Sequence, residues 1–345
     1  MPFNPKYTIT NRLLSQITRI NALVAELNNR HFSHIILVEL EKVARAVSAH
    51  ASTSIEGNPL PLTEVKKILK NKPAHIRDSE KEVLNYNQAL QASDNDLKKG
   101  MVNLSRELIL SLQRQVTQGL LPEYESGKFR QRPVVVNDPR SGKVVFLPPD
   151  YQEVEPLMTD LLTFVKVSQS VIDPLILAGV FHKQMVIIHP FMDGNGRTTR
   201  LATKLLLAEM GLNTFNLFSF ENYYNQNVTR YFQTVGEFGN YYELVDKVDF
   251  TGWLEYFTEG ILDELLRVQA ILPTIVLSPN EVLQPYHEKI LTHIKEQGFI
   301  TDKDYALLVD RAKATRVLDF QKLIEWGLIV RKGSGPATYY TLNDK

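Results

Sequence analysis

The chain has 345 residues, which suits two or three domains rather than one compact core. Its 39 basic and 39 acidic side chains balance, so no overall field draws it to nucleic acid or to an acidic membrane. It contains no cysteine, which excludes disulfides, thiolate catalysis and cysteine-bound zinc and fits a reducing, cytoplasmic location.

The first hundred residues are predicted to be helical. They show no signal-peptide pattern, and no apolar run in the chain is long enough to span a membrane, so no membrane contact is expected. An apolar face at spacings of three and four runs through Leu13, Ile17, Ile20, Leu23 and Leu27. A second helical pattern starts at Ser33 and stops at the breaker Gly57-Asn58-Pro59, and two more cover residues 62–71 and 79–93.

The middle of the chain changes from helix to strand and back. After an amphipathic stretch over residues 101–125, two β-branched runs, Val134–Val136 and Val144–Leu147, flank the turn-rich "NDPRSG" and predict a β-hairpin. Helical patterns follow over residues 153–167 and 173–189, where Pro190 helps to end the second helix. A further helix is predicted from about Gly194 to Gly211.

Beyond residue 280 the pattern is three helices and then two strands that turn at "KGSGPA", which is typical of a winged helix. We therefore predict a mainly α fold. It comprises an N-terminal helical region over residues 1–100, a central helical bundle with a β-hairpin over 101–275, and a winged-helix domain over 281–345.

The segment "HPFMDGNGRTTR", His189 to Arg200, carries the strongest chemical signal. Gly194, Asn195 and Gly196 can turn consecutive backbone N–H groups inward at the start of a helix, which is a site for a phosphate. Arg197 and Arg200 lie three residues apart, so they share a face of that helix and can bind further phosphate oxygens.

Two other residues of this segment complete the chemistry. Asp193 precedes the turn, and a carboxylate beside phosphates is well placed to hold Mg²⁺. His189 titrates near neutrality and can accept the proton of an attacking hydroxyl. Each feature alone is more often a helix stop, a turn or a solvated face, but together they indicate nucleotidyl or phosphoryl transfer.

Residues 189–200 match the signature of the Fic family, H-x-F-x-(D/E)-G-N-G-R-x-x-R, at every specified position. The resemblance implies a mostly helical fold and transfer of AMP from ATP to a Ser, Thr or Tyr hydroxyl of a protein. It implies that His189 is the base, that Asp193 holds Mg²⁺, that residues 194–196 form the anion hole, and that Arg197 and Arg200 contact the distal phosphates. Phe191 is then a core residue.

The segment "STSIEGN" resembles the inhibitory motif of the family, (S/T)-x-x-x-E-(G/N), through Ser52, Glu56 and Gly57. The alternative is an ordinary helix end with a glycine cap. If the resemblance holds, Glu56 pairs with Arg200 and puts a carboxylate where phosphate oxygens belong.

Two other segments agree with the family. The hairpin over residues 133–147, with Val134, Val135 and Val136 in its first strand, resembles the flap that aligns a target segment by main-chain pairing. "NVTRYF" resembles the stretch that packs near the adenine in relatives, through Asn227 and Tyr231. Its last position is Phe232, and Tyr231 is equally consistent with a core aromatic residue.

The predicted winged helix could contact DNA through Arg311, Lys313, Arg316 and Lys332. The neighbouring acidic residues Asp310, Asp319 and Glu325 offset this charge, and winged helices also bind proteins, so a protein-docking or dimerisation role is favoured over DNA.

The sequence thus indicates an ATP- and Mg²⁺-dependent protein adenylyltransferase, restrained by Glu56, that acts on a target protein. Three alternatives stay open: removal of AMP from a modified protein, a different nucleotide donor, and a DNA-binding regulator that senses nucleotide. The target protein, the signal that relieves inhibition and the oligomeric state, including a homodimer, are not indicated.

Overall fold

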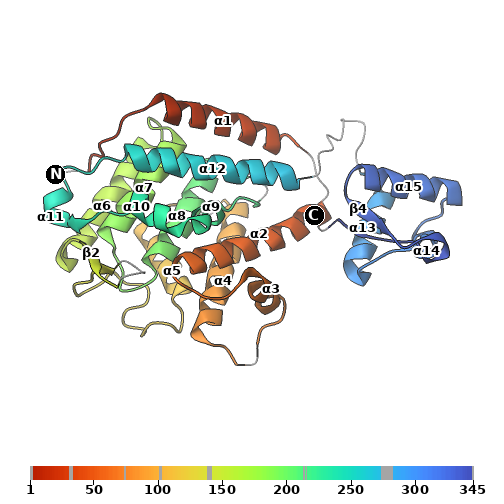
Figure 1. The fold of residues 1–345 in the computed structure, drawn as a ribbon, viewed down its shortest axis with the longest axis horizontal. Coiled ribbons are helices and arrows are strands. Elements are labelled where there is room, and N and C mark those ends of the chain that lie inside the picture. The colour runs from red at the N-terminus through yellow and green to blue at the C-terminus, as the bar shows by residue number, and fades with distance from the viewer. Residues whose placement is uncertain are drawn as a thin grey trace. The chain divides into compact units, whose positions relative to one another are not determined.

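The computed structural model describes residues 3–30, 34–73, 75–100, 103–137, 142–212, 214, 216–272 and 283–343, and it is mostly helical, as predicted (Figure 1). The helices are α1 Asn11–Asn28, α2 His34–Ile55, α3 Leu62–Lys70, α4 Asp78–Lys98, α5 Arg106–Val116, α6 Tyr151–Ser168, α7 Pro174–Ile188, α8 Asn195–Glu209, α9 Phe220–Gln226, α10 Val228–Val235, α11 Tyr241–Leu244, α12 Thr251–Ile271, α13 Pro285–Gln297, α14 Asp302–Leu308 and α15 Lys313–Glu325. The strands are β1 Val136–Asn137, β2 Val144–Leu147, β3 Gly239–Asn240, β4 Ile329–Lys332 and β5 Tyr339–Leu342.

The chain divides into two compact units. One contains residues 1–22 and 43–264, and the other contains residues 23–42 and 265–345. The end of α2, with the segment 52–58, therefore belongs to the same unit as the segment 189–200. The predicted three-part division into residues 1–100, 101–275 and 281–345 remains a prediction.

Helices α7 and α8 form the centre of the larger unit. Helix α7 is buried on nearly every side, and its first turn is set by Pro174 and by Asp173, whose side chain accepts a hydrogen bond from the Leu175 N–H at 2.9 Å. Helix α8 packs against α7, α5 and α4. A helix that is apolar on all sides is stable only when its neighbours cover it. The turn between α7 and α8 joins two packed helices, so the core of this unit fixes its position.

The predicted hairpin is present but shorter than expected. Val136 pairs with Phe146 in an antiparallel ladder, whereas Val134 and Val135 lie outside β1. The prediction that the strand starts at Val134 is therefore wrong. The backbone at Arg130 is tied to the carbonyl of Pro190 at 2.9 Å, so the chain follows the α7–α8 turn before it joins the sheet.

The hairpin also has a third strand that the sequence pattern did not suggest. Strand β2 pairs in parallel with β3, where Phe146 lies opposite Gly239, so the sheet order is β1-β2-β3. Residues 138–141 of the predicted turn lie outside the described residues.

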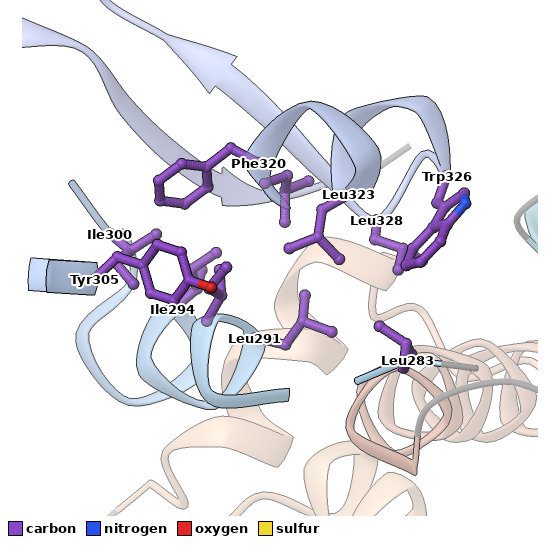
Figure 2. Packing of buried hydrophobic residues seen from close by; sticks show 11 residues of the cluster. Leu283, Leu291, Ile294, Ile300, Tyr305, Phe320, Leu323, Trp326 and Leu328 are labelled. Carbon is purple, nitrogen blue, oxygen red and sulfur yellow. The ribbon is translucent and has the colours of Figure 1, made fainter. Parts of the chain in front are cut away.

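Residues 283–343 follow the predicted order of three helices, α13 to α15, and two antiparallel strands, β4 and β5. Their core gathers leucine, isoleucine and aromatic side chains from all three helices and from the segment between α15 and β4 (Figure 2). The ring of Phe320 stacks on Tyr340 with centroids 4.0 Å apart, which joins α15 to β5. The winged-helix assignment of this region remains a proposal.

Among the described helices, none combines the length and the apolar content needed to cross a bilayer.

Candidate active site

The turn between α7 and α8 has two residues in the left-handed conformation. His189 ends α7 with φ 49°, and Gly194 caps the start of α8 with φ 79°. A Cβ at Gly194 would lie 2.8 Å from Cγ2 of Thr117, so both the backbone angle and the space require glycine. The side chain of Asn195 accepts from the N–H of Phe191 and donates to its carbonyl, both at 2.9 Å. The side chain of Asn195 is therefore used within the turn. Only the backbone N–H of Asn195 is left for a ligand.

A carboxylate lies at the N-terminus of α8. Oε1 of Glu56, just after the end of α2, accepts a hydrogen bond from Nη2 of Arg200 at 2.7 Å. The same oxygen lies so close to Gly196 that a Cβ at that position would collide with it. The first N–H groups of a helix lack intrahelical partners and its dipole favours negative charge there. The Glu56 carboxylate thus stands where an anionic ligand would bind, and the predicted pair with Arg200 is present.

The guanidinium of Arg200 is fully buried at 0% exposure. Its Nε donates to Oγ of Ser52 at 2.9 Å and its Nη2 to the carbonyl of Ser52 at 2.7 Å. Burial by itself lowers the pKa of Arg200, but the Glu56 carboxylate, together with the hydroxyls of Tyr231 and Tyr86, more than offsets this, so the pKa is raised. Gly57 turns the chain away with φ 95°. Two residues of the predicted inhibitory motif, Ser52 and Glu56, therefore bond Arg200, and Gly57 follows them at the turn after α2.

Arg197 is also held by carboxylates. Its Nη2 donates to both carboxylate oxygens of Asp193, at 3.0 and 2.9 Å, and its Nη1 lies 3.4 Å from Oε1 of Glu82. Within the described residues, Nε and Nη1 of Arg197 make no hydrogen bond, although both are buried. Glu82 also accepts a hydrogen bond from Asn58 at 2.8 Å, which links α4 to the end of the inhibitory segment. Glu82 was not predicted as a partner of the site, because an acidic residue on a helix is normally solvated.

The candidate base, His189, is poised in its neutral form. Burial lowers its pKa to about 4, although the Val186 carbonyl and the carboxylates of Glu56 and Asp193 act in the opposite direction, and Arg130 lowers it further. A neutral imidazole can accept a proton, so its charge state at neutral pH suits a general base.

The residues expected near an adenine are less accessible. Asn227 caps α10, where its Oδ1 accepts from the N–H of Arg230 at 3.0 Å. Tyr231 is 1% exposed, and its hydroxyl lies 3.0 Å from Nε2 of the buried His182. Both are in the same unit as Arg200, whose guanidinium carbon lies 6.0 Å from the Tyr231 ring. Their role toward a nucleotide remains a prediction.

The basic residues expected to contact DNA are partly engaged within their own region. Nε of Arg311 lies 2.9 Å from Oδ2 of the buried Asp319, and Nε and Nη2 of Arg316 each donate to a carboxylate oxygen of Asp302 at 2.9 Å. Lys313, at the start of α15, and Lys332, at the end of β4, are exposed. Contact of these four residues with DNA is untested.

The comparisons with known proteins point to one family. Residues 103–207 match the sequence model of the Fic/DOC family. The chain is 30% identical over 179 residues to Protein adenylyltransferase Fic of Culex quinquefasciatus, covering 51% of this chain and 34% of that protein. It is 30% identical over 212 residues to Protein adenylyltransferase fic-1 of Caenorhabditis briggsae, covering 59% and 40%. The match therefore spans well under half the length of these curated relatives.

Solved structures share the fold. A Fic family protein from Desulfovibrio desulfuricans G20 superposes with a TM-score of 0.66 at 21% identity, covering 99% of each chain. Residues 134–508 of Fic-1 from C. elegans superpose with a TM-score of 0.59 at 22% identity, covering 76% of this chain and 73% of that one. At these identities the likeness is one of fold.

Proposed function

We propose, from the match of residues 103–207 to the sequence model of the Fic/DOC family, that the protein is a protein adenylyltransferase restrained by its own Glu56. It transfers AMP from ATP to a Ser, Thr or Tyr hydroxyl of a target protein. The observation that carries the proposal is the carboxylate of Glu56 at the N-terminus of α8, bonded to a fully buried arginine. A buried arginine and a helix N-terminus that are occupied by an internal anion are what an inhibited polyphosphate site requires.

The phosphates of ATP take the place of that carboxylate. The first N–H groups of α8, at Asn195 and Gly196, bind phosphate oxygens, and a residue larger than glycine at position 196 would fill the space. Arg200 and Arg197 project from the same helix toward these oxygens and neutralise their charge. Removal of Glu56 leaves Arg200 buried beside the site with its charge unopposed.

His189 supplies the base. Its imidazole takes the proton of the target hydroxyl while the hydroxyl oxygen bonds to the α-phosphorus of ATP. The bond from that phosphorus to the oxygen bridging to the β-phosphate breaks, and pyrophosphate leaves. Because burial keeps His189 neutral, the base is available without a prior deprotonation.

A magnesium ion fits the residues that are present. Mg²⁺ is usually bound by one or two carboxylates together with phosphate oxygens, and Asp193 presents one carboxylate that is about half exposed at the mouth of the site. Asp193 would hold the ion, which would supply further neutralisation of phosphate charge. Arg197, now bonded to both Asp193 oxygens, would then turn toward the phosphates.

The burial of the Glu56–Arg200 pair sets the free energy by which Glu56 disfavours ATP binding. Leaving one member of a buried ion pair without its partner costs about 3–5 kcal/mol. Glu56 is 29% exposed at its side chain, so we expect the lower part of this range or slightly less. Since about 1.4 kcal/mol is a factor of ten, productive ATP binding is disfavoured by about a hundredfold.

The target protein binds the site at the flap. In the sheet order β1-β2-β3, strand β2 is paired on both sides, so a target segment adds at the outer edge of β1, next to Val134, Val135 and Val136.

The pairing of Arg311 and Arg316 with acidic residues supports protein docking over DNA binding for the C-terminal region. The absence of cysteine supports a cytoplasmic location.

The experiment that tests this function is intact mass spectrometry after incubation with ATP and Mg²⁺. The Glu56→Gly protein should gain AMP groups by self-modification, wild type should gain few, and the double variant with His189→Ala should gain no more than wild type. A Glu56→Gly protein that is no more modified than wild type would contradict the proposed restraint.

A further inference from the structure

Arg130 lies between α5 and β1, and its side chain is almost entirely buried, at 3% exposure. A buried arginine needs strong hydrogen-bond acceptors, because its charge is costly to remove from water. Its contacts therefore show which part of the molecule it serves.

The hydrogen bonds of Arg130 converge on the end of α7. Its Nε donates to the carbonyl of His189 at 2.9 Å, and its backbone N–H donates to the carbonyl of Pro190 at 2.9 Å. Its Nη2 donates to the carbonyl of Pro149 at 2.5 Å and lies 3.5 Å from that of Ile188. A cation at this place also complements the negative C-terminal end of the α7 dipole.

The residue it holds is in an unfavourable conformation. His189 adopts φ 49°, a left-handed backbone that a side chain with a Cβ rarely takes. Such a conformation persists only where the surroundings fix it. The bonds from Arg130 to the carbonyl of His189 and to the next carbonyl along the chain, that of Pro190, fix it here, together with the bond from the His189 N–H to the Met185 carbonyl at 3.0 Å. The direction of the His189 side chain follows from that backbone.

The same guanidinium ties the base to the flap. Pro149 comes two residues after the end of β2, and its carbonyl shares the guanidinium with the carbonyl of His189. Arg130 therefore fixes the backbone after the flap relative to the backbone at the base.

We propose that Arg130 is a positioning residue of the transfer reaction, which fixes the turn at His189 and joins it to the flap. The inference rests on the proposed function for its kinetic part. Its electrostatic part starts from geometry: the 2.9 Å bond from Nε of Arg130 places the guanidinium at the His189 carbonyl, where its charge lowers the pKa of the imidazole while the Glu56 and Asp193 carboxylates raise it. A positive charge at position 130 disfavours the imidazolium.

The test uses the full chain in the Glu56→Gly background, with Arg130→Lys, Arg130→Met and the matched control Arg132→Met. Arg132 lies on the same segment but is exposed and pairs with Glu125. Initial rates of self-modification against ATP concentration give kcat and KM, and titration of the His189 ring by NMR gives its pKa without any need for activity.

Both Arg130 variants should lose about tenfold to a hundredfold in kcat with KM for ATP almost unchanged, since misplacing a reacting group mainly affects the chemical step. Arg130→Met should also raise the pKa of His189, whereas Arg130→Lys, which keeps the charge, should leave it near the parent value. Arg132→Met should match the parent in every respect.

An unchanged His189 pKa in Arg130→Met would overturn the electrostatic part, and an unchanged kcat in both folded variants would overturn the positioning part. If Arg130→Met does not fold, Arg130→Lys still tests the kcat, and a parental kcat in that variant overturns the positioning part. Absence of any transfer by the Glu56→Gly parent would instead count against the proposed function, and the NMR titration would still decide the electrostatic part.

Discussion

The α7–α8 turn and the C-terminal region both contain arginines that the sequence marks as phosphate ligands, and they use them differently. In the turn, the partner of Arg200 is Glu56, which lies 144 residues earlier in the sequence. Its carboxylate reaches Arg200 in the space that the missing side chain of Gly196 leaves open. In the C-terminal region, the partner of Arg311 is Asp319, which is itself buried and also accepts a hydrogen bond from Tyr305 at 2.7 Å.

The two ion pairs differ in whether a ligand can displace the internal carboxylate. The Glu56 carboxylate is partly exposed and follows the end of a helix, so a stronger anion can replace it without disturbing the core. Asp319 bonds a core tyrosine and an arginine together, so removing either partner disturbs the fold. A basic side chain is available to a ligand only when its internal partner can leave.

The largest effect is expected at the base. In the Glu56→Gly background, His189→Ala should lower the transfer rate by about 10²–10⁴-fold, because the hydroxyl loses its proton acceptor. ATP affinity should change little, since the phosphates are bound by α8 and its arginines. Rates from mass spectrometry and affinity from calorimetry check this, and a variant that keeps the parental rate would show that another group is the base.

Removing the internal anion is expected to have the next largest effect. Glu56→Gly should raise the transfer rate of the otherwise native chain by about a hundredfold, because Arg200 becomes free to bind phosphate. Glu123→Gly, at an exposed turn, is the matched control and should leave the rate unchanged. Equal rates for the two variants would mean that the Glu56–Arg200 pair is structural.

The pH profile should separate His189 from an ordinary histidine. Its folded pKa of about 4 lies below the usual 6.5, so the neutral form is present from pH 6.5 upward and is lost only as the pH falls toward 4. Stability linked to this group is likewise complete above pH 6.5 and decreases as the pH falls from 6.5 to 4. The rate of Glu56→Gly should therefore stay flat from pH 6.5 to 8. A loss of about threefold between pH 7 and pH 6, which a base with the ordinary pKa of 6.5 would give, would contradict the lowered pKa.

In the C-terminal region we expect an effect on stability. Arg311→Ala should lower the free energy of unfolding by about 1–3 kcal/mol, because it leaves the buried Asp319 carboxylate without its cation, and Arg311 is partly exposed. Lys332→Ala, at the exposed end of β4, should change it by less than about 0.5 kcal/mol. Denaturant titrations measure both. An unchanged stability of Arg311→Ala, together with weaker binding to duplex DNA, would favour the DNA-binding interpretation.

The smallest effect is expected at Glu82. Its carboxylate lies 3.4 Å from Nη1 of Arg197 and is partly exposed, so the pair is weak. Glu82→Gln should raise the transfer rate only about twofold to fivefold, and the effect should add to that of Glu56→Gly if the two carboxylates act separately. A lower rate in Glu82→Gln would show that Glu82 orients Arg197 for catalysis.

The sequence predicted most of the helices and the turn at residues 189–200, because the turn is contiguous and its glycines and arginines act through local geometry. It predicted the pair of Glu56 and Arg200 through a family resemblance, since no spacing rule links residues 144 positions apart. Arg130 was not predicted, because its partners are backbone carbonyls, which every residue type has and which no sequence pattern can indicate. The third strand was missed because β3 is two residues long and pairs across a distant part of the chain.

The central claim is that Glu56 occupies a phosphate site at the start of α8. The most direct measurement is a crystal structure of the Glu56→Gly protein with ATP and Mg²⁺. The account predicts a phosphate within hydrogen-bonding distance of the Gly196 N–H and the Arg200 guanidinium, with the α-phosphorus facing His189. ATP bound elsewhere, with this helix end vacant, would contradict it.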